Sequence, residues 1–470
     1  MGPLGIRRPP EWGVDPTPET VRILRTFDLF VFWSSLAVGL LVLIAGSLLV
    51  ITYNLTLWET VVVAFVGSLI GALVLAGAGV FGSKYGVPMM VGLRPILGTK
   101  GSWVPSAVNI FQLVGWTSFE LYVMGFAATA ISGAFLGGYT IPFWIIIFSI
   151  VVVVLALGGP IAVIKTWLEK VAIWLILISM VVVGYFIFAH PTNPFSWGTR
   201  AQPGGSGSLL LAIDLVIAMP ISWWPLISDF NRFAKNRMSA AVGTISGYTF
   251  ANFLFYFLGA ALILATGAVD AIAGIAMLGL GSFVLLLILV DETDNAFADV
   301  YSAALSFQNI RKKTKQLSVI VVATIISLGV AIYLSGTNEL VTFGYENFLL
   351  MIGALFVPLL GIVLADFWLV RKGNYSIGEF YGKSPRVRWR PFAAWIPGII
   401  LYYGLSPSLV QALFPSFQGL PYTIGASVPS FVLSALLYTV LSKLPLHARV
   451  IAPSPNHAGP AARGAAKPGD

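Results

Sequence analysis

An acidic cluster stands inside one of the most apolar stretches of the chain. The segment LLLILVDETDNAFADVYSAALSF lacks Lys and Arg but contains Asp291, Glu292, Asp294, Asn295 and Asp299. Each charge at the middle of a bilayer costs roughly 2.5–3.5 kcal/mol on insertion scales. Four carboxylates in a membrane helix are therefore expected to face a cation, a proton or a polar cavity.

Helical spacing divides this acidic cluster between two faces. Glu292, Asn295 and Asp299 are three and four residues apart and share one face of a helix, while Asp291 and Asp294 lie on an adjacent face. The alternative is that the helix ends early and the acids lie in a loop. The apolar residues that follow are too few to form a separate crossing helix, which favours the helical interpretation. The sequence leaves open which acids carry a proton.

A second constellation lies in the segment NIFQLVGWTSFELYVMG. Gln112, Trp116 and Glu120 are four residues apart and share a helix face. An indole can stack on a flat ring, and a carboxylate can accept hydrogen bonds from its N–H groups or pair with its positive charge. Many tryptophans instead form belts at the membrane surface. The neighbouring carboxylate favours a binding role for Trp116.

The composition indicates the elements that must position these residues. Of the 470 residues 57% are hydrophobic and 10% are charged, whereas a soluble domain has about 25% charged residues. Apolar stretches long enough to cross a bilayer recur. The sequence thus predicts an all-α polytopic membrane protein with about twelve transmembrane helices. They span approximately 29–51, 58–82, 104–131, 142–164, 167–189, 208–228, 240–266, 279–306, 317–335, 347–370, 392–413 and 424–443.

The basic residues indicate the orientation of these helices. With twelve spans, 26 of the 27 Lys and Arg residues fall on one side, and Arg200 alone falls on the other. The positive-inside rule then places both termini in the cytoplasm of a multi-pass protein of the cell membrane. Because orientation accounts for the net charge of +8, no nucleic-acid partner is expected. The lipid bilayer is the expected surrounding.

Five regions follow from this arrangement. They are a cytoplasmic N-terminal segment (1–28), a region of ten helices (29–370), a cytoplasmic loop (371–391), two further helices (392–443) and a disordered cytoplasmic tail (444–470). The chain has no cysteine, which excludes disulfides and thiolate metal sites. Its three histidines lie in predicted loops or the tail, so no zinc site is expected.

Two of the predicted spans contain signals for a break. The sixth, LLLAIDLVIAMPISWWPLISDF, holds Pro220 and Pro225, which predict a kink or unwinding near residues 219–225. The first has a weaker signal in Ser34, Ser35 and Gly39. Interrupted helices at matching places in two halves are typical of a secondary transporter's binding site. Ordinary kinks and packing glycines are the alternative.

Several motifs resemble one family. The segment SDFNRFAKN after the sixth span is similar to a signature of the nucleobase:cation symporter family, class one, of cytosine/purine, uracil, thiamine and allantoin permeases. SKYGVPMMVGLRPILGTKGS and ADVYSA resemble other stretches of that family, in the same order, and the likeness covers most of residues 25–310. NIFQLVGWT and MPISWWPLISDFNRF look closest to its hydroxymethylpyrimidine/thiamine or cytosine permease branch.

The resemblance implies a fold and two sets of residues. The fold is a five-plus-five inverted repeat, as in sodium-coupled amino-acid transporters, with helices 1 and 6 broken and the last two helices peripheral. The implied substrate-binding residues are Trp116, Glu120, Ser222, Trp223 and Asp299, to which the shared helix faces add Gln112 and Asn295. The implied ion-binding residues, which could hold Na⁺, are Ala37, Leu40, Thr293 and Asp294.

The chain departs from the family at three of these positions. Glu120 stands where Gln is common, Asp299 where an amide is common, and Asp294 where Ser or Thr is common. The added negative charge favours a cationic or donor-rich substrate, such as an aminopyrimidine or a thiamine-like compound, over hydantoin or uracil. Asp294 could bind Na⁺ or exchange H⁺, and no other cofactor is expected.

The predicted function is import of a nucleobase or related nitrogen heterocycle coupled to Na⁺ or H⁺. A cation-coupled amino-acid, amine or drug transporter of the same fold is the alternative. A membrane enzyme is disfavoured, because the acids lack the His or Cys partners that usually accompany such sites. The exact substrate, the coupling ion and the oligomeric state stay open.

Overall fold

The computed structural model describes residues 12–133, 140–278, 281–337, 345–382, 384–406 and 425–444, and within them the chain forms helices and no β-strand. The side chains of 281–288, 290–291 and 345–346 are not described. The predicted tail from residue 445, the first eleven residues, the end of the eleventh span and the Asp291 side chain therefore lie outside the described residues.

Helices coincide with each of the twelve predicted segments. The first half contains η1 (Glu19–Val21), α1 (Thr26–Ser35), α2 (Leu40–Ile51), α3 (Leu57–Ala78), α4 (Val80–Tyr85), α5 (Met89–Gly92), α6 (Arg94–Leu97), α7 (Trp103–Ser132), α8 (Ile141–Ala162), η2 (Val163–Ala172) and α9 (Ile173–Ala189). The second half contains α10 (Leu209–Ser222), α11 (Ile227–Asn231), α12 (Arg237–Thr266), α13 (Ala271–Met277), α14 (Gly281–Ile310), α15 (Gln316–Ser335), α16 (Tyr345–Leu364), η4 (Ala365–Val370), α17 (Ile377–Phe380), α18 (Trp389–Gly404) and α20 (Ser427–Lys443).

Length and composition identify the membrane-crossing helices. In the described part of the chain, five helical segments are long and apolar enough to cross a bilayer, and the bent pair α1–α2 makes a sixth. The shorter helices α10 and α20 are also apolar. The protein is thus a multi-pass membrane protein, and the count of twelve crossings stays a prediction.

The contacts between helices follow the symmetry of an inverted repeat, in which a contact has a counterpart between the spans five positions away in the chain. Helix α1 packs on α12, and α10, five predicted spans later, packs on α3. Likewise η2 packs on α1, while α16 packs on α10. The central pairs α3–α12 and α7–α14 are each made of two spans five apart in the chain. This pattern is the one that a five-plus-five repeat produces.

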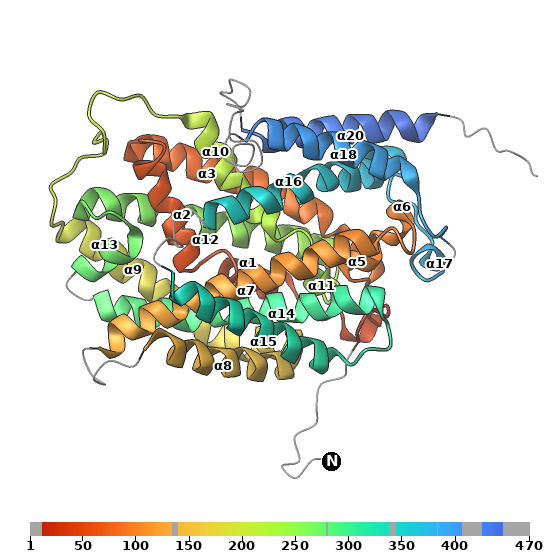
Figure 1. Ribbon diagram of the computed structural model, residues 1–470, viewed down its shortest axis with the longest axis horizontal. Helices are drawn as coiled ribbons and strands as arrows, with labels where there is room; N and C mark the ends of the chain where they lie inside the picture. The colour runs from red at the N-terminus through yellow and green to blue at the C-terminus, as the bar shows by residue number, and fades with distance from the viewer. Residues whose placement is uncertain are drawn as a thin grey trace, which may run out of the picture.

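The remaining helices surround these pairs. Figure 1 shows α7, α14, α15 and α8 on one side of the molecule, and these four helices pack on one another. Helices α18 and α20 lie together at the opposite edge, where they pack on α16 and on each other. The last two spans thus pack mainly on the tenth span and on each other, and their peripheral role stays a prediction.

Two spans are interrupted by non-helical residues. Helices α1 and α2 meet at an angle of 65° across residues 36–39, although the sequence signal there was weak. Gly39 allows this bend, because its φ of 144° is a conformation that other residues rarely adopt. In the sixth span α10 ends at Ser222 and α11 begins at Ile227. Pro225 lies in this break, as the sequence predicted.

The boundary between the fourth and fifth spans differs from the prediction. The sequence placed a loop at residues 165–166, but the helix continues through the π-helix η2 into α9. The chain bends earlier, at Gly159, where φ is 71° and ψ is 162°. Lys165 lies in η2 and pairs with Asp28 of α1 at 2.5 Å. A residue expected in a connecting loop thus holds the first and fifth spans together.

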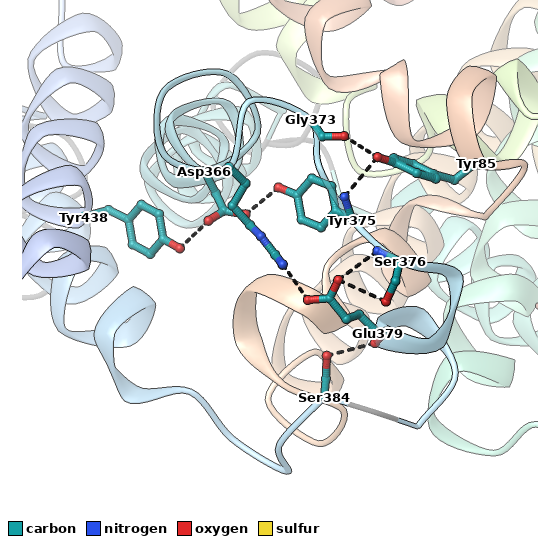
Figure 2. A network of polar contacts seen from close by, with 9 residues as sticks. Tyr85, Asp366, Gly373, Tyr375, Ser376, Glu379, Ser384 and Tyr438 are labelled. Atoms are coloured by element: carbon teal, nitrogen blue, oxygen red, sulfur yellow. Dashed lines mark hydrogen bonds and ion pairs between the residues drawn. The ribbon is translucent and has the colours of Figure 1, made fainter. Parts of the chain in front are cut away.

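A polar network fixes the segment after η4 (Figure 2). The Asp366 carboxylate accepts hydrogen bonds from the hydroxyls of Tyr375 and Tyr438, the latter at 2.6 Å. The Tyr85 hydroxyl, at the end of α4, donates to the carbonyl of Gly373. The connection between α16 and α18 is therefore tied to both the second span and the peripheral helix α20.

The SDFNRF motif joins several elements at the end of the sixth span. Each of its four polar residues, Ser228, Asp229, Asn231 and Arg232, bonds a different segment. Their partners are, in order, the Gly82 amide (3.0 Å), the Met89 amide (2.9 Å), the Trp33 indole (3.0 Å) and the Tyr301 hydroxyl (2.9 Å). The structural role of this motif is to position α11 against α1, α4, α5 and α14.

Candidate functional site

A cavity lies where the two breaks face α7 and α14. The space inside it that the centre of a water molecule can occupy is about 20 Å³, enough for roughly one water. Its apolar wall comprises Leu36, Val38, Leu41, Val42, Leu113, Met219 and Leu226. Its polar and aromatic wall comprises Trp116, Glu120, Ser222, Trp223, Glu292, Asn295 and Asp299.

Six of the seven substrate-site candidates from the sequence line this cavity. They are Trp116, Glu120, Ser222, Trp223, Asn295 and Asp299. The seventh, Gln112, is buried one turn away on α7, where its amide donates to Asn109 at 2.7 Å. The structure thus brings α7, the sixth-span break and the acidic face of α14 together, and it places Gln112 behind the wall.

The polar atoms of this wall are mainly hydrogen-bond acceptors. Among the described residues, Glu120 Oε2, Asp299 Oδ2 and Asn295 Oδ1 are buried and have no hydrogen-bond partner. The Asn295 amide nitrogen already donates to the Val38 carbonyl at 3.0 Å. The Ser222 hydroxyl already donates to the Met219 carbonyl at 2.7 Å. A ligand that supplies donors would satisfy the unpaired acceptors, which are costly to leave buried.

Aromatic rings form the other recognition element. Trp116 and Trp223 are 8% and 9% exposed and line the cavity. The Trp116 ring also meets the edge of Phe348, with centroids 5.6 Å apart and planes at 76°. Trp224 has a different position: it is fully buried, and its indole donates to the Phe356 carbonyl at 3.2 Å. Trp224 is therefore a packing residue.

The break in the first span is bonded directly to α14. The Leu40 amide donates to Glu292 Oε2 at 3.0 Å, one turn from the bond between Asn295 and Val38. The Ser35 hydroxyl donates to the Asp294 carboxylate. Three polar residues of α14 thus bond residues inside the break and on both sides of it.

Glu292 was not predicted as a site residue. Its helical spacing from Asn295 and Asp299, which puts the three residues on one face, was the available signal. The contact with Leu40 joins residues 252 positions apart, so no local pattern could reveal it.

The four ion-site candidates lie next to the cavity and not in its wall. Ala37 is inside the first-span break, and Leu40 begins α2. Thr293 and Asp294 lie on α14 and are 4% and 0% exposed, and Asp294 accepts the Ser35 hydroxyl beside this break. Of the two Asp294 oxygens, Oδ1 has no hydrogen-bond partner among the described residues. Oxygen atoms from a helix break and a facing helix are the usual cation ligands in such transporters.

Two broken helices around a shared cavity, in a fold of matched halves, are typical of a secondary transporter. The family can be stated as well. The chain belongs to the permeases for cytosine/purines, uracil, thiamine and allantoin, whose model matches residues 16–425. It is therefore a transporter and not an enzyme.

Curated relatives match over most of the chain. A hydantoin permease of Microbacterium maritypicum is 22% identical over 456 residues, which are 91% of this chain and 90% of the relative. A cytosine permease of Escherichia coli (strain K12) is 26% identical over 364 residues, which are 71% of this chain and 78% of the relative. The sequence similarity thus extends over most of the length of these permeases.

Solved structures agree on the fold. A nucleobase-cation-symport-1 family transporter, in a closed conformation with bromovinylhydantoin bound, superposes with a TM-score of 0.76 at 18% identity and covers 92% of this chain and 95% of that one. A Na⁺-coupled sialic acid symporter superposes with a TM-score of 0.61 at 13% identity and covers 92% and 91%. At sequence identities this low, the similarity to these structures shows a shared fold only.

Proposed function

We propose that the protein imports a nucleobase or related nitrogen heterocycle across the cell membrane by alternating access, driven by Na⁺ or H⁺. One observation carries the proposal: the cavity combines the indoles of Trp116 and Trp223 with the unpaired acceptors of Glu120 and Asp299. Flat rings with N–H groups fit such a wall, because the rings stack and the N–H groups donate.

The excess of carboxylates favours a cationic or donor-rich substrate. Glu120, Glu292 and Asp299 line one cavity, and no Lys or Arg is among its lining residues in the described part of the chain. An aminopyrimidine protonated beside its amino group presents two parallel N–H donors, which match a carboxylate in bidentate fashion. Thiamine contains the same aminopyrimidine and adds a permanent positive charge. Uracil and hydantoin present more carbonyl acceptors, which would meet carboxylate oxygens.

The coupling ion is proposed to bind beside this cavity. Ala37 and Leu40 offer backbone carbonyls at the first-span break, and Thr293 and Asp294 offer side-chain oxygens from α14. The unpaired Oδ1 of Asp294 supports this assignment. A carboxylate at this position can hold Na⁺ as an oxygen ligand or take up H⁺. Either ion would act on the same contact between the first span and α14.

An amine or amino-acid substrate is the second candidate. The same three carboxylates would attract an ammonium group as well as a protonated ring, and a drug with such a group would fit equally. The two indoles in the wall favour the heterocycle, because stacking needs a flat partner. The family to which the chain belongs favours it too.

A thermal-shift panel on the purified protein tests the proposal. The ligands are cytosine, hydroxymethylpyrimidine, thiamine, uracil, hydantoin and a set of aliphatic amines, each with and without Na⁺ at two pH values. Aminopyrimidines should raise the melting temperature most, in a manner that depends on Na⁺ or on pH. Stabilisation by aliphatic amines alone would support the second candidate and contradict the first.

A further inference from the structure

Glu292 occupies a position that joins the cavity to the first-span break. Its side chain lines the cavity and is 1% exposed, and its Oε2 accepts the Leu40 amide at 3.0 Å. Among the described residues that line the cavity, no other accepts a hydrogen bond from that amide. The same carboxylate therefore faces a prospective ligand and the backbone of α2.

The Leu40 amide needs an acceptor from elsewhere in the molecule. Leu40 is the first residue of α2, and the first amides of a helix have no partner within it. The preceding residue, Gly39, has no side chain that could cap the helix. Glu292 supplies the cap from α14, and its negative charge suits the positive end of the helix dipole.

Gly39 also makes room for this contact. A Cβ atom added at Gly39 would collide with the Glu292 carboxylate. The glycine thus serves twice, through its φ of 144° and through the close approach that it permits. Both Gly39 and Glu292 are needed for this contact, which is therefore part of the structure of the break.

A ligand in the cavity would share Glu292 with α2. Leu41 and Val42, which follow the capped amide, line the same cavity. Glu120 and Asp299 offer further unpaired acceptors in its wall. A carboxylate has about four acceptor positions, so Glu292 can bond a ligand N–H while it holds Leu40. An uncharged amide in its place would attract a cation less and would cap α2 less strongly.

We infer that Glu292 is a specificity-determining residue that selects cationic or donor-rich ligands and, through the Leu40 amide, fixes the conformation of the first-span break in response to them. This inference rests on the proposed function for the nature of the ligand. Its positioning role can be measured without any ligand.

The test compares Glu292→Gln with a matched control in the full-length protein. Asp214→Asn is the control, because Asp214 is also a buried carboxylate that accepts an amide at the start of another helix, that of Ser427, and it does not line the cavity. The binding probes are hydroxymethylpyrimidine and thiamine, with uracil as the neutral competitor. Glu292→Gln should weaken aminopyrimidine binding at least tenfold relative to uracil, and Asp214→Asn should change this ratio less than twofold.

Thiol labelling measures the positioning role. Because the chain has no cysteine, Leu41→Cys introduces a unique probe beside the capped amide. Glu292→Gln should change the labelling rate of this probe at least threefold without ligand, and Asp214→Asn should leave it unchanged. Equal rates in the two variants, or an unchanged ligand preference in Glu292→Gln, would overturn the inference. If the unsubstituted protein binds no heterocycle at all, the proposed function fails, and the labelling rates still decide the positioning role.

Discussion

The side-chain amide of Asn295 donates to the backbone carbonyl of Val38 at 3.0 Å. This hydrogen bond joins the middle of α14 to the unwound part of the first span. Asn295 also lines the cavity with its unpaired Oδ1. One residue thus contacts the break and faces the ligand space, so its replacement should affect stability and binding together.

Asn295→Ala leaves the Val38 carbonyl without its donor. An unsatisfied buried polar group costs about 1–3 kcal/mol, so we expect a lower melting temperature and weaker ligand binding. Asn252→Ala is the control, because Asn252 is a buried donor to Ser68 at 2.8 Å between α12 and α3. The control should lose stability and keep ligand affinity. If the Asn295→Ala protein keeps its ligand affinity, the hydrogen bond between Asn295 and Val38 does not contribute to binding.

Trp116→Ala should weaken binding of any aromatic substrate. Aromatic pairs contribute about 0.5–1.5 kcal/mol beyond area burial, and about 1.4 kcal/mol corresponds to tenfold in affinity. We expect a loss of about tenfold by equilibrium binding, most of which Trp116→Phe should restore. Trp224→Phe provides a comparison, since Trp224 packs outside the cavity. If Trp116→Ala binds its ligand with full affinity, stacking on Trp116 does not contribute to binding.

Asp294→Asn should change the ion or pH dependence of uptake. The substitution keeps a side chain that can accept the Ser35 hydroxyl and removes the charge that a cation or proton would meet. Ser35→Ala tests the hydrogen bond alone, and Asp366→Asn neutralises a buried carboxylate far from the break. If uptake in proteoliposomes retains its full response to Na⁺ and pH in Asp294→Asn, the residue is structural.

Glu379 predicts a pH effect on stability outside the membrane-spanning segments. Partial burial of its carboxyl opposes ionisation, but hydrogen bonds from the Ser376 amide and from Arg371 hold its pKa below the ordinary value (Figure 2). A lowered pKa in the folded state stabilises the protein above the unfolded-state value, about 4.3 for glutamate, and this stabilisation is lost as the pH falls through the folded-state pKa.

Glu379→Gln should therefore lower the melting temperature at neutral pH and make little difference at about pH 3. Thermal melts at the two pH values measure the difference. Glu19→Gln, at an exposed position, should show no such dependence. An equal loss in Glu379→Gln at both pH values would mean that the charge of Glu379 is not involved.

Local patterns predicted the parts of the site that lie on single helices. Trp116 and Glu120 share a face because a helix brings residues four apart together, and Asn295 and Asp299 do so for the same reason. Pro225 predicted the break in the sixth span, because proline cannot continue a helix. The apolar stretches of the sequence predicted the positions of the long helices, because a membrane-crossing helix needs about twenty apolar residues.

Other features depend on contacts between distant residues. The sharp bend at Gly39 forms beside Glu292, which lies 253 residues later, and neither residue alone indicates the pair. The sequence placed Gly159 inside the fourth span and a loop at residues 165–166, because Lys165 and Lys170 suggested a polar connection, whereas the chain bends at Gly159 and continues as a π-helix. Lys165 instead pairs with Asp28. Gln112 shares the face of Trp116, but its amide is taken up by Asn109.

Equilibrium binding of labelled hydroxymethylpyrimidine to the purified protein and to a Glu120→Ala, Asp299→Ala variant tests the central claim most directly. The claim is that a donor-rich heterocycle binds between α7 and α14. Saturable binding at one site per chain is expected, with at least a tenfold loss in the variant, because hydrogen bonds to charged groups contribute about 1.5–3 kcal/mol. Binding that is absent in the unsubstituted protein, or that persists unchanged in a folded variant, would contradict the claim.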